Sequence, residues 1–325
     1  MNKNRSNNYL LSSLLKYIRR PKYDLVSVTG SFKSKLSDMM QYWSLGVVVA
    51  FLSVMLSAIF LSNIGVDDSQ NVLEDFFNNG SIFVIVLVVF FVGPITEELT
   101  FRLGLRFSPF RFGFALVFVL LLLLEVLMAV NMQLNDIFGN IILHLGTTYF
   151  LILSLFLIIV FGFLFSYIVS RSMISEKINN FYKKHFALIF YSFTFLFGVI
   201  HFFNFANFKE LWFVLPLLFA PQIFLGFILS YIRMGYGLPW SIFYHFFHNT
   251  LAALPILLFA QISDESMDII LNSTDNNVQD VPFADRLLLL TGSGVSLLVF
   301  ILVVIFFVQL MKNHRKYLIS KNHSR

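Results

Sequence analysis

Two adjacent glutamates, Glu97 and Glu98, follow a long apolar stretch and belong to the sequence PITEELTFR, residues 94–102. Glu98 and Arg102 are four residues apart, so on a helix they share one face and can form an ion pair. Glu97 is rotated by about 100° from Glu98 and does not share that partner. A carboxylate near a low-dielectric region suits a general base that activates water. The alternative interpretation is an interfacial glutamate pair beside a snorkelling arginine.

Two further motifs place histidines in apolar segments. His201 ends the sequence FGVIH, in which Gly198 would allow another helix to approach closely. His245 and Asn249, in HFFHN, are four residues apart and share one helix face. Such a pair can hold a metal, or a water and a developing oxyanion; the alternative for both motifs is hydrogen bonding between helices. Together with the glutamate pair, these motifs supply the smallest set of side chains that could activate a water inside a membrane.

The composition places this chemistry in a bilayer. Of 325 residues, 58% are hydrophobic and only 13% are charged, whereas soluble proteins carry about 25% charged residues. A single soluble core could not hide so much apolar surface. We therefore predict an all-α, polytopic transmembrane helical bundle that contacts the lipid bilayer and has no nucleic-acid partner. The chain contains no cysteine, which excludes disulfides and thiol chemistry.

Eight segments are apolar and long enough to cross a bilayer, which requires roughly 20 residues each. They are, approximately, 44–65, 81–101, 113–132, 141–169, 186–205, 211–232, 238–261 and 287–311. Basic connections alternate with acidic or neutral ones, and both ends of the chain are basic. By the positive-inside rule, we predict a multi-pass protein of the plasma membrane with both termini in the cytoplasm.

The predicted organisation has four parts. They are a basic cytoplasmic segment (1–43), a membrane bundle with the motifs (44–262), a polar extracytoplasmic loop (263–286), and a last transmembrane helix with a basic cytoplasmic tail (287–325). In the first part, YLLSSLLKYIRR is either an amphipathic helix on an anionic inner leaflet or a plain basic flank that sets the topology. The two interpretations are equally well supported.

The order EExxxR, FxxxH, HxxxN resembles the CPBP family of membrane proteins, which contains the type II CAAX prenyl endopeptidases and Abi-like proteases. The resemblance implies that Glu97 activates water with help from His201. It also implies that His245 and Asn249 stabilise an oxyanion. Glu98 and Arg102 match the rest of the first motif.

A metal requirement is left open by the resemblance. Glutamate and histidine suit a divalent ion such as Zn²⁺, and its ligands would be Glu97, His201 and His245. The motifs do not decide whether such an ion is bound.

Two features depart from the family pattern. The first and second motifs are separated by an inserted hairpin, about 106–185, whose Glu125 and His144 have no counterpart in the motifs. We interpret Glu125 as protonated or hydrogen-bonded to a neighbouring helix, with substrate access as the alternative. In addition, His201 lies about 16 residues into its predicted span, at a different depth from Glu97, unless a helix is tilted or broken or begins outside the hydrocarbon.

The resemblance implies an intramembrane endopeptidase that hydrolyses a peptide bond in a membrane-associated peptide or protein. The first alternative is a non-catalytic immunity or scaffold protein with the same fold. The second is a proton-coupled transporter that uses the buried carboxylates and histidines as a relay. Other membrane proteases are disfavoured, because the chain lacks HExxH, GxGD and a complete rhomboid GxSG motif.

Overall fold

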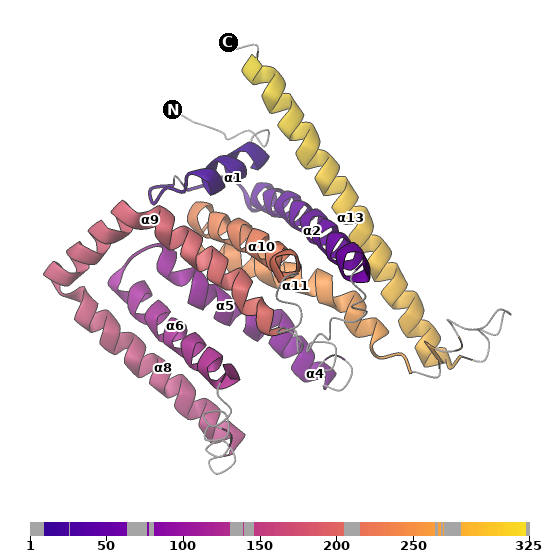
Figure 1. Cartoon of the computed structure of the whole chain (residues 1–325), viewed down its shortest axis with the longest axis horizontal. Helices are drawn as coiled ribbons and strands as arrows, with labels where there is room; N and C mark the ends of the chain where they lie inside the picture. Colours follow the sequence, from indigo (N-terminus) through magenta and orange to yellow (C-terminus); the bar gives the residue numbers. More distant parts are fainter. Residues whose placement is uncertain are drawn as a thin grey trace.

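A computed structural model describes residues 10–25, 27–63, 81–130, 146–204, 215–263 and 281–322, with Phe77, Gly139, Ser266, Met267 and Ile269 as isolated positions. Its main elements are α1 (Leu10–Arg19), α2 (Phe32–Asn63), α4 (Ile82–Ile85), η2 (Val86–Val92), α5 (Gly93–Phe101), η3 (Leu103–Leu105), α6 (Pro109–Val130), α8 (Thr147–Ser170), α9 (Ser172–Ile200), η4 (His201–Asn204), α10 (Leu215–Gly235), α11 (Leu238–Phe259) and α13 (Phe283–Asn322). Every one of these elements is helical (Figure 1). Among the described residues, eight helical segments are long and apolar enough to span a membrane. The predicted all-α bundle of eight spans is confirmed.

Helices α2, α9 and α13 extend well beyond the predicted apolar segments. Helix α2 begins at Phe32 rather than near residue 44, because polar residues of its first turns are buried against other helices. Tyr236 donates a hydrogen bond of 2.8 Å to Asp38, and Asn313 donates one of 3.1 Å to Gln41. Hydropathy alone does not detect such buried polar pairs, so the predicted start was too late.

The helix that precedes His201, α9, is longer than predicted and is bent. This helix begins at Ser172, well before the predicted span, and has a non-helical residue, His185, at which it bends (Figure 1). Its last turn crosses α10 so closely that a Cβ on Gly198 would lie 2.2 Å from Cγ1 of Ile223. The expected close approach at Gly198 is confirmed, and it brings His201 to the interior of the bundle.

The inserted segment forms a helical hairpin of α6 and α8, which lies on one side of the molecule (Figure 1). The two helices touch through small residues: a Cβ on Gly113 would lie 2.4 Å from Oγ of Ser166. Helix α6 also packs against α5, the helix that carries the glutamate pair. The hairpin therefore borders the candidate site. His144 lies outside the described residues, as does most of the predicted loop 263–286.

The basic N-terminal stretch contains the helix α1, which spans Leu10–Arg19. Leu14 and Tyr17 are buried, and the Tyr17 ring packs edge-on against Phe190 and Tyr231. Helix α1 thus buries apolar residues against other helices of the protein. It lies on the same side of the molecule as the C-terminal end of α13 (Figure 1), where Ser12 and His314 are hydrogen-bonded at 3.1 Å.

Candidate active site

The helix that carries the glutamate pair is interrupted just before it. Residues of η2 form a π-helix, in which the Gly93 N–H bonds to the carbonyl of Val88, five residues back. The next carbonyl in this pattern belongs to Val89, and its partner would be the N–H of Pro94, which proline lacks. The side-chain amide of Asn249 donates to this carbonyl at 3.1 Å. Asn249 therefore fixes α11 against the irregular turn, a kind of turn often found at functional sites.

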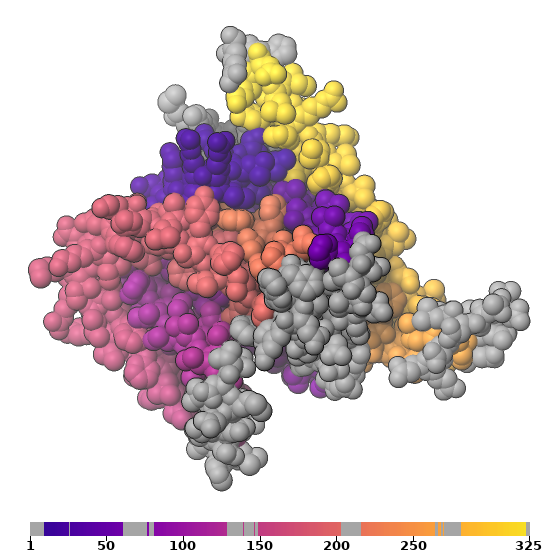
Figure 2. Space-filling model, viewed as in Figure 1, coloured from indigo at the N-terminus to yellow at the C-terminus, as the bar shows by residue number. Residues whose placement is uncertain are grey.

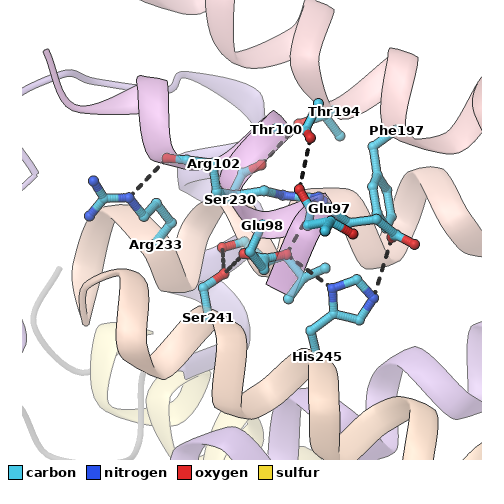
Figure 3. Close-up of polar contacts among 12 residues, drawn as sticks. Glu97, Glu98, Thr100, Arg102, Thr194, Phe197, Ser230, Arg233, Ser241 and His245 are labelled. Atoms are coloured by element: carbon cyan, nitrogen blue, oxygen red, sulfur yellow. Dashed lines mark hydrogen bonds and ion pairs between the residues drawn. The ribbon is translucent and has the colours of Figure 1, made fainter. Parts of the chain in front are cut away.

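Glu98 is fully buried and has three side-chain partners (Figure 3). Its Oε1 lies 3.5 Å from a guanidinium nitrogen of Arg102, which confirms the predicted pair on one helix face. The same oxygen lies 3.1 Å from Nδ1 of His245, while Oε2 accepts a hydrogen bond from Ser241. Because a carboxylate only accepts, Nδ1 of His245 carries a proton. Glu98 thus fixes the tautomer and orientation of His245.

Arg102 is fully buried and is held at both its charged end and its carbonyl. Its guanidinium lies 3.8 Å from the centroid of the Phe197 ring, within range of a cation–π interaction. Its carbonyl oxygen, at the end of α5, accepts a 2.9 Å hydrogen bond from Nε of Arg233 on α10 (Figure 3). This contact satisfies a carbonyl that a helix end leaves without a partner.

Glu97 is not paired with Arg102, as expected from its rotation, but it faces His245. Its Oε2 lies 3.6 Å from Nε2 of His245, on the opposite side of the imidazole from Glu98 (Figure 3). The charges of Glu98 and Arg102 cancel if both groups are ionised. One further proton, shared between the Glu97 carboxylate and Nε2 of His245, then makes the net charge of the four side chains zero. Neutrality of this kind suits ionisable groups inside a bilayer.

His201 also has a defined tautomer. Its Nδ1 lies 2.7 Å from the carbonyl oxygen of Phe197, which can only accept, so Nδ1 is the protonated nitrogen. In the neutral ring, Nε2 then carries a lone pair. The ring of Phe197 contacts the rings of both His201 and His245 edge-on, with centroids 4.9 and 5.8 Å apart. One aromatic residue thus lies against both histidines and Arg102.

Two cavities meet at Glu97 and His201, which line both of them. The first, called here the α11 cavity, has a volume of about 440 Å³, and its other polar lining residues are Gln222, His245, His248 and Asn249. The second, the hairpin cavity, has a volume of about 550 Å³ and lies against α6 and α8; its other polar lining residues are Thr96, Thr100, Glu125 and Ser154. Most other lining residues of both cavities are apolar. An extended apolar ligand could occupy either cavity beside Glu97.

The predicted metal ligands are not arranged as a metal site. Among the described residues, no group of three or more His, Asp or Glu side chains is positioned to hold an ion. Glu97 and His245 are in contact, and His201 shares the cavities with Glu97, but the three do not converge on a point.

No protein-family model, curated protein sequence or solved structure matches this chain. The CPBP assignment thus remains a prediction that rests on the three motifs. The structure brings Glu97, Glu98, Arg102 and His245 into direct contact. The remaining predicted residues, His201 and Asn249, line the α11 cavity together with Glu97 and His245.

Sequence reasoning missed Ser241 and Arg233 as members of this site. Ser241 precedes His245 by four residues, so it lies on the same face of α11, and this spacing was a usable signal. Arg233 was not assigned to the site, although its side chain donates hydrogen bonds to the carbonyl oxygens of Arg102 and Leu103. No local pattern could have shown this contact, because it joins residues more than a hundred positions apart.

Proposed function

We propose that this protein is an integral membrane endopeptidase of the CPBP type, which hydrolyses a peptide bond in a membrane-associated peptide or protein. One observation carries the proposal: the Glu97 carboxylate faces Nε2 of His245 at 3.6 Å, at the wall shared by two cavities. A carboxylate in this position can reach a water and a peptide carbonyl at the same time. The apolar lining suits a substrate segment that enters from lipid.

In the proposed reaction, Glu97 is the general base. A water lies between the Glu97 carboxylate and the Nε2 lone pair of His201, and its oxygen attacks the carbonyl carbon of the substrate. Glu97 accepts the proton of this water and then transfers it to the nitrogen of the scissile bond as the C–N bond breaks. The products are a carboxylic acid and an amine, so the atoms and protons balance.

The oxyanion of the intermediate would receive hydrogen bonds from two side chains. When Glu97 is ionised, the shared proton resides on Nε2 of His245, which then donates to the oxyanion. Asn249 has two amide N–H bonds and uses one of them for the Val89 carbonyl, so the second can also donate. Glu98 holds His245, and Ser241 in turn holds Glu98. Both act as positioning residues, because neither touches the reacting atoms.

We further propose that the side with α1 and the end of α13 is cytoplasmic and that the membrane is the plasma membrane. The side chains supporting this orientation are basic: Lys16, Arg20, Lys312, Arg315 and Lys316. The positive-inside rule places such residues in the cytoplasm. Labelling of single cysteines introduced at Lys316 and at Asn63 with an impermeant reagent tests this orientation.

Activity of the purified protein in liposomes tests the proposed function. Wild type, Glu97→Gln and the control Glu176→Gln, an exposed glutamate of α9, are incubated with quenched membrane-tethered peptides. Cleavage by wild type and the control, but not by Glu97→Gln, supports the peptidase. A cellular phenotype that survives Glu97→Gln would instead support the non-catalytic scaffold, and proton-driven solute uptake would support the transporter.

A further inference from the structure

A third cavity, lined by none of the motif residues, lies between α1, the chain that follows α1, and α10. It has a volume of about 590 Å³. Its lining includes the cationic side chains of Lys16, Arg20 and Lys22, and its apolar wall includes the rings of Tyr17 and Tyr231. None of the residues assigned to the proposed reaction lines it. The cavity therefore needs an explanation of its own.

Among the described residues, the side chains that line this cavity carry more positive than negative charge. Lys16, Arg20 and Lys22 contribute three positive charges, and Asp24 is the one acidic residue of the lining. In the part of the chain that the structure describes, no salt bridge involves any of these three cations. Like charges gathered in one cavity repel each other, and an anion bound among them would remove this repulsion.

The walls of the cavity are held by contacts to the rest of the protein. The Tyr17 hydroxyl donates to the carbonyl of Lys22 at 3.0 Å, and the Tyr191 hydroxyl of α9 donates to the carbonyl of Ile18 at 2.7 Å. Burial raises the pKa of Tyr17 above its usual range, so its hydroxyl stays a donor at neutral pH. Lys16, Arg20 and Lys22 are thus presented by a backbone that is fixed before any ligand binds, which favours affinity.

The position of α1 indicates where the ligand comes from. Helix α1 lies on the surface, across one end of the bundle beside α9 and α13 (Figure 2). Next to the exposed Lys16, it carries Leu15 with 48% of its surface exposed. Exposed apolar and basic side chains on one helix are typical of the interface between lipid tails and headgroups.

We propose that this cavity binds the phosphate-bearing headgroup of an anionic phospholipid. Arg20 would bind two phosphate oxygens through its planar guanidinium, and Lys16 and Lys22 would contribute single charge-assisted hydrogen bonds. The ligand would join α1 to the bilayer at a defined site, in addition to the general attraction between basic residues and an anionic leaflet. The proposal does not depend on the peptidase function.

A simpler explanation is that the basic residues only complement the carbonyl end of α1, as cations in the last turn of a helix do. This explanation applies equally to Arg19, which is exposed in the same turn but does not line the cavity. The effects of substituting Arg19 and Arg20 on lipid binding therefore distinguish a helix-end effect from a headgroup site.

Native mass spectrometry of the full chain in detergent, titrated with phosphatidylglycerol or phosphatidylcholine, tests the proposal. We expect wild type to retain phosphatidylglycerol in preference to phosphatidylcholine. The triple variant Lys16→Gln, Arg20→Gln, Lys22→Gln should lose affinity for phosphatidylglycerol on the order of a hundredfold, because it removes every charge-assisted hydrogen bond that the three side chains would donate to the phosphate. The control Arg19→Gln, Lys33→Gln, Lys184→Gln removes the same charge outside the cavity and should bind like wild type.

Equal retention by the triple variant and wild type, or an equal loss in the control, would overturn the proposal. Inorganic phosphate is the second probe: if it displaces phosphatidylglycerol at micromolar concentration, the ligand is a soluble phosphate rather than a lipid. The single variants Arg20→Gln and Arg19→Gln repeat the comparison with less perturbation, in case the triple variant does not fold. For the proposal to hold, Arg20→Gln must then lose phosphatidylglycerol, whereas Arg19→Gln must retain it.

Discussion

His245 lies between the two glutamates of the first motif: Nδ1 is 3.1 Å from Glu98 and Nε2 is 3.6 Å from Glu97. The imidazole therefore joins a fully buried carboxylate, fixed by Arg102 and Ser241, to one that faces two cavities. This arrangement assigns different tasks to adjacent residues of identical type. Glu98 positions the histidine, whereas Glu97 remains available to a substrate.

Removal of the Arg102 charge should destabilise the protein. In Arg102→Gln, Glu98 would remain buried without its cation, and breaking such a pair costs about 3–5 kcal/mol. The double variant Glu98→Gln, Arg102→Gln should be more stable than Arg102→Gln alone, because no uncompensated charge is left. Thermal unfolding in detergent measures both; an Arg102→Gln protein as stable as wild type would show that the pair is not formed.

Asn249 is expected to have two separable roles. Asn249→Asp keeps the shape of the side chain but replaces the donor to Val89 with an acceptor, so it should lower stability by about 1–3 kcal/mol. Loss of an oxyanion donor should also lower kcat about a hundredfold or more. The control is Thr250→Val, which changes the next residue of α11. Thr250 lies outside both cavities, so this variant should keep wild-type kcat. Wild-type kcat in Asn249→Asp would remove Asn249 from the proposed reaction.

The crossing of α9 and α10 should not tolerate a side chain at Gly198. A Cβ there would lie 2.2 Å from Cγ1 of Ile223, and overpacking of this kind costs about 1–3 kcal/mol. Gly198→Ala should therefore lower the melting temperature, and the additional change Ile223→Ala should restore part of it. Gly294→Ala is the matched control, because no atom lies within 4 Å of the added Cβ. Similar melting temperatures for the two single variants would contradict the close crossing.

The hairpin cavity should admit part of the substrate. Ser154 lines this cavity, so Ser154→Phe would fill part of its volume and should lower kcat/KM at unchanged melting temperature. Ile152, two residues earlier on α8, is 59% exposed and does not line the cavity; Ile152→Phe should have wild-type activity. Equal activity of both variants would restrict the substrate to the α11 cavity.

The sequence was sufficient to predict what depends on local spacing. Eight spans follow from hydropathy, and the contact of Glu98 with Arg102 follows from a separation of four residues on a helix. The close approach at Gly198 was also expected, because a small residue in an apolar helix permits it. Each of these features is a property of one segment.

Features that depend on the packing of several segments were not predicted. The early start of α2 results from buried polar pairs with distant helices, such as Asp38 with Tyr236. The bend at His185 and the π-helix before Pro94 alter helices without a change in hydropathy. The position of His245 between Glu97 and Glu98 joins α11 to α5, and spacing within either helix could not show it.

Hydrolysis in water enriched in ¹⁸O tests the central claim, that Glu97 activates a water for peptide-bond cleavage. Wild type, Glu97→Gln and Glu176→Gln are reconstituted in liposomes with a membrane-tethered peptide that wild type cleaves, and the new C-terminus is analysed by mass spectrometry. We predict one ¹⁸O atom in the new carboxylate for wild type and Glu176→Gln, and a rate at least about a hundredfold lower for Glu97→Gln. Equal cleavage by Glu97→Gln, or cleavage without ¹⁸O, would contradict the account.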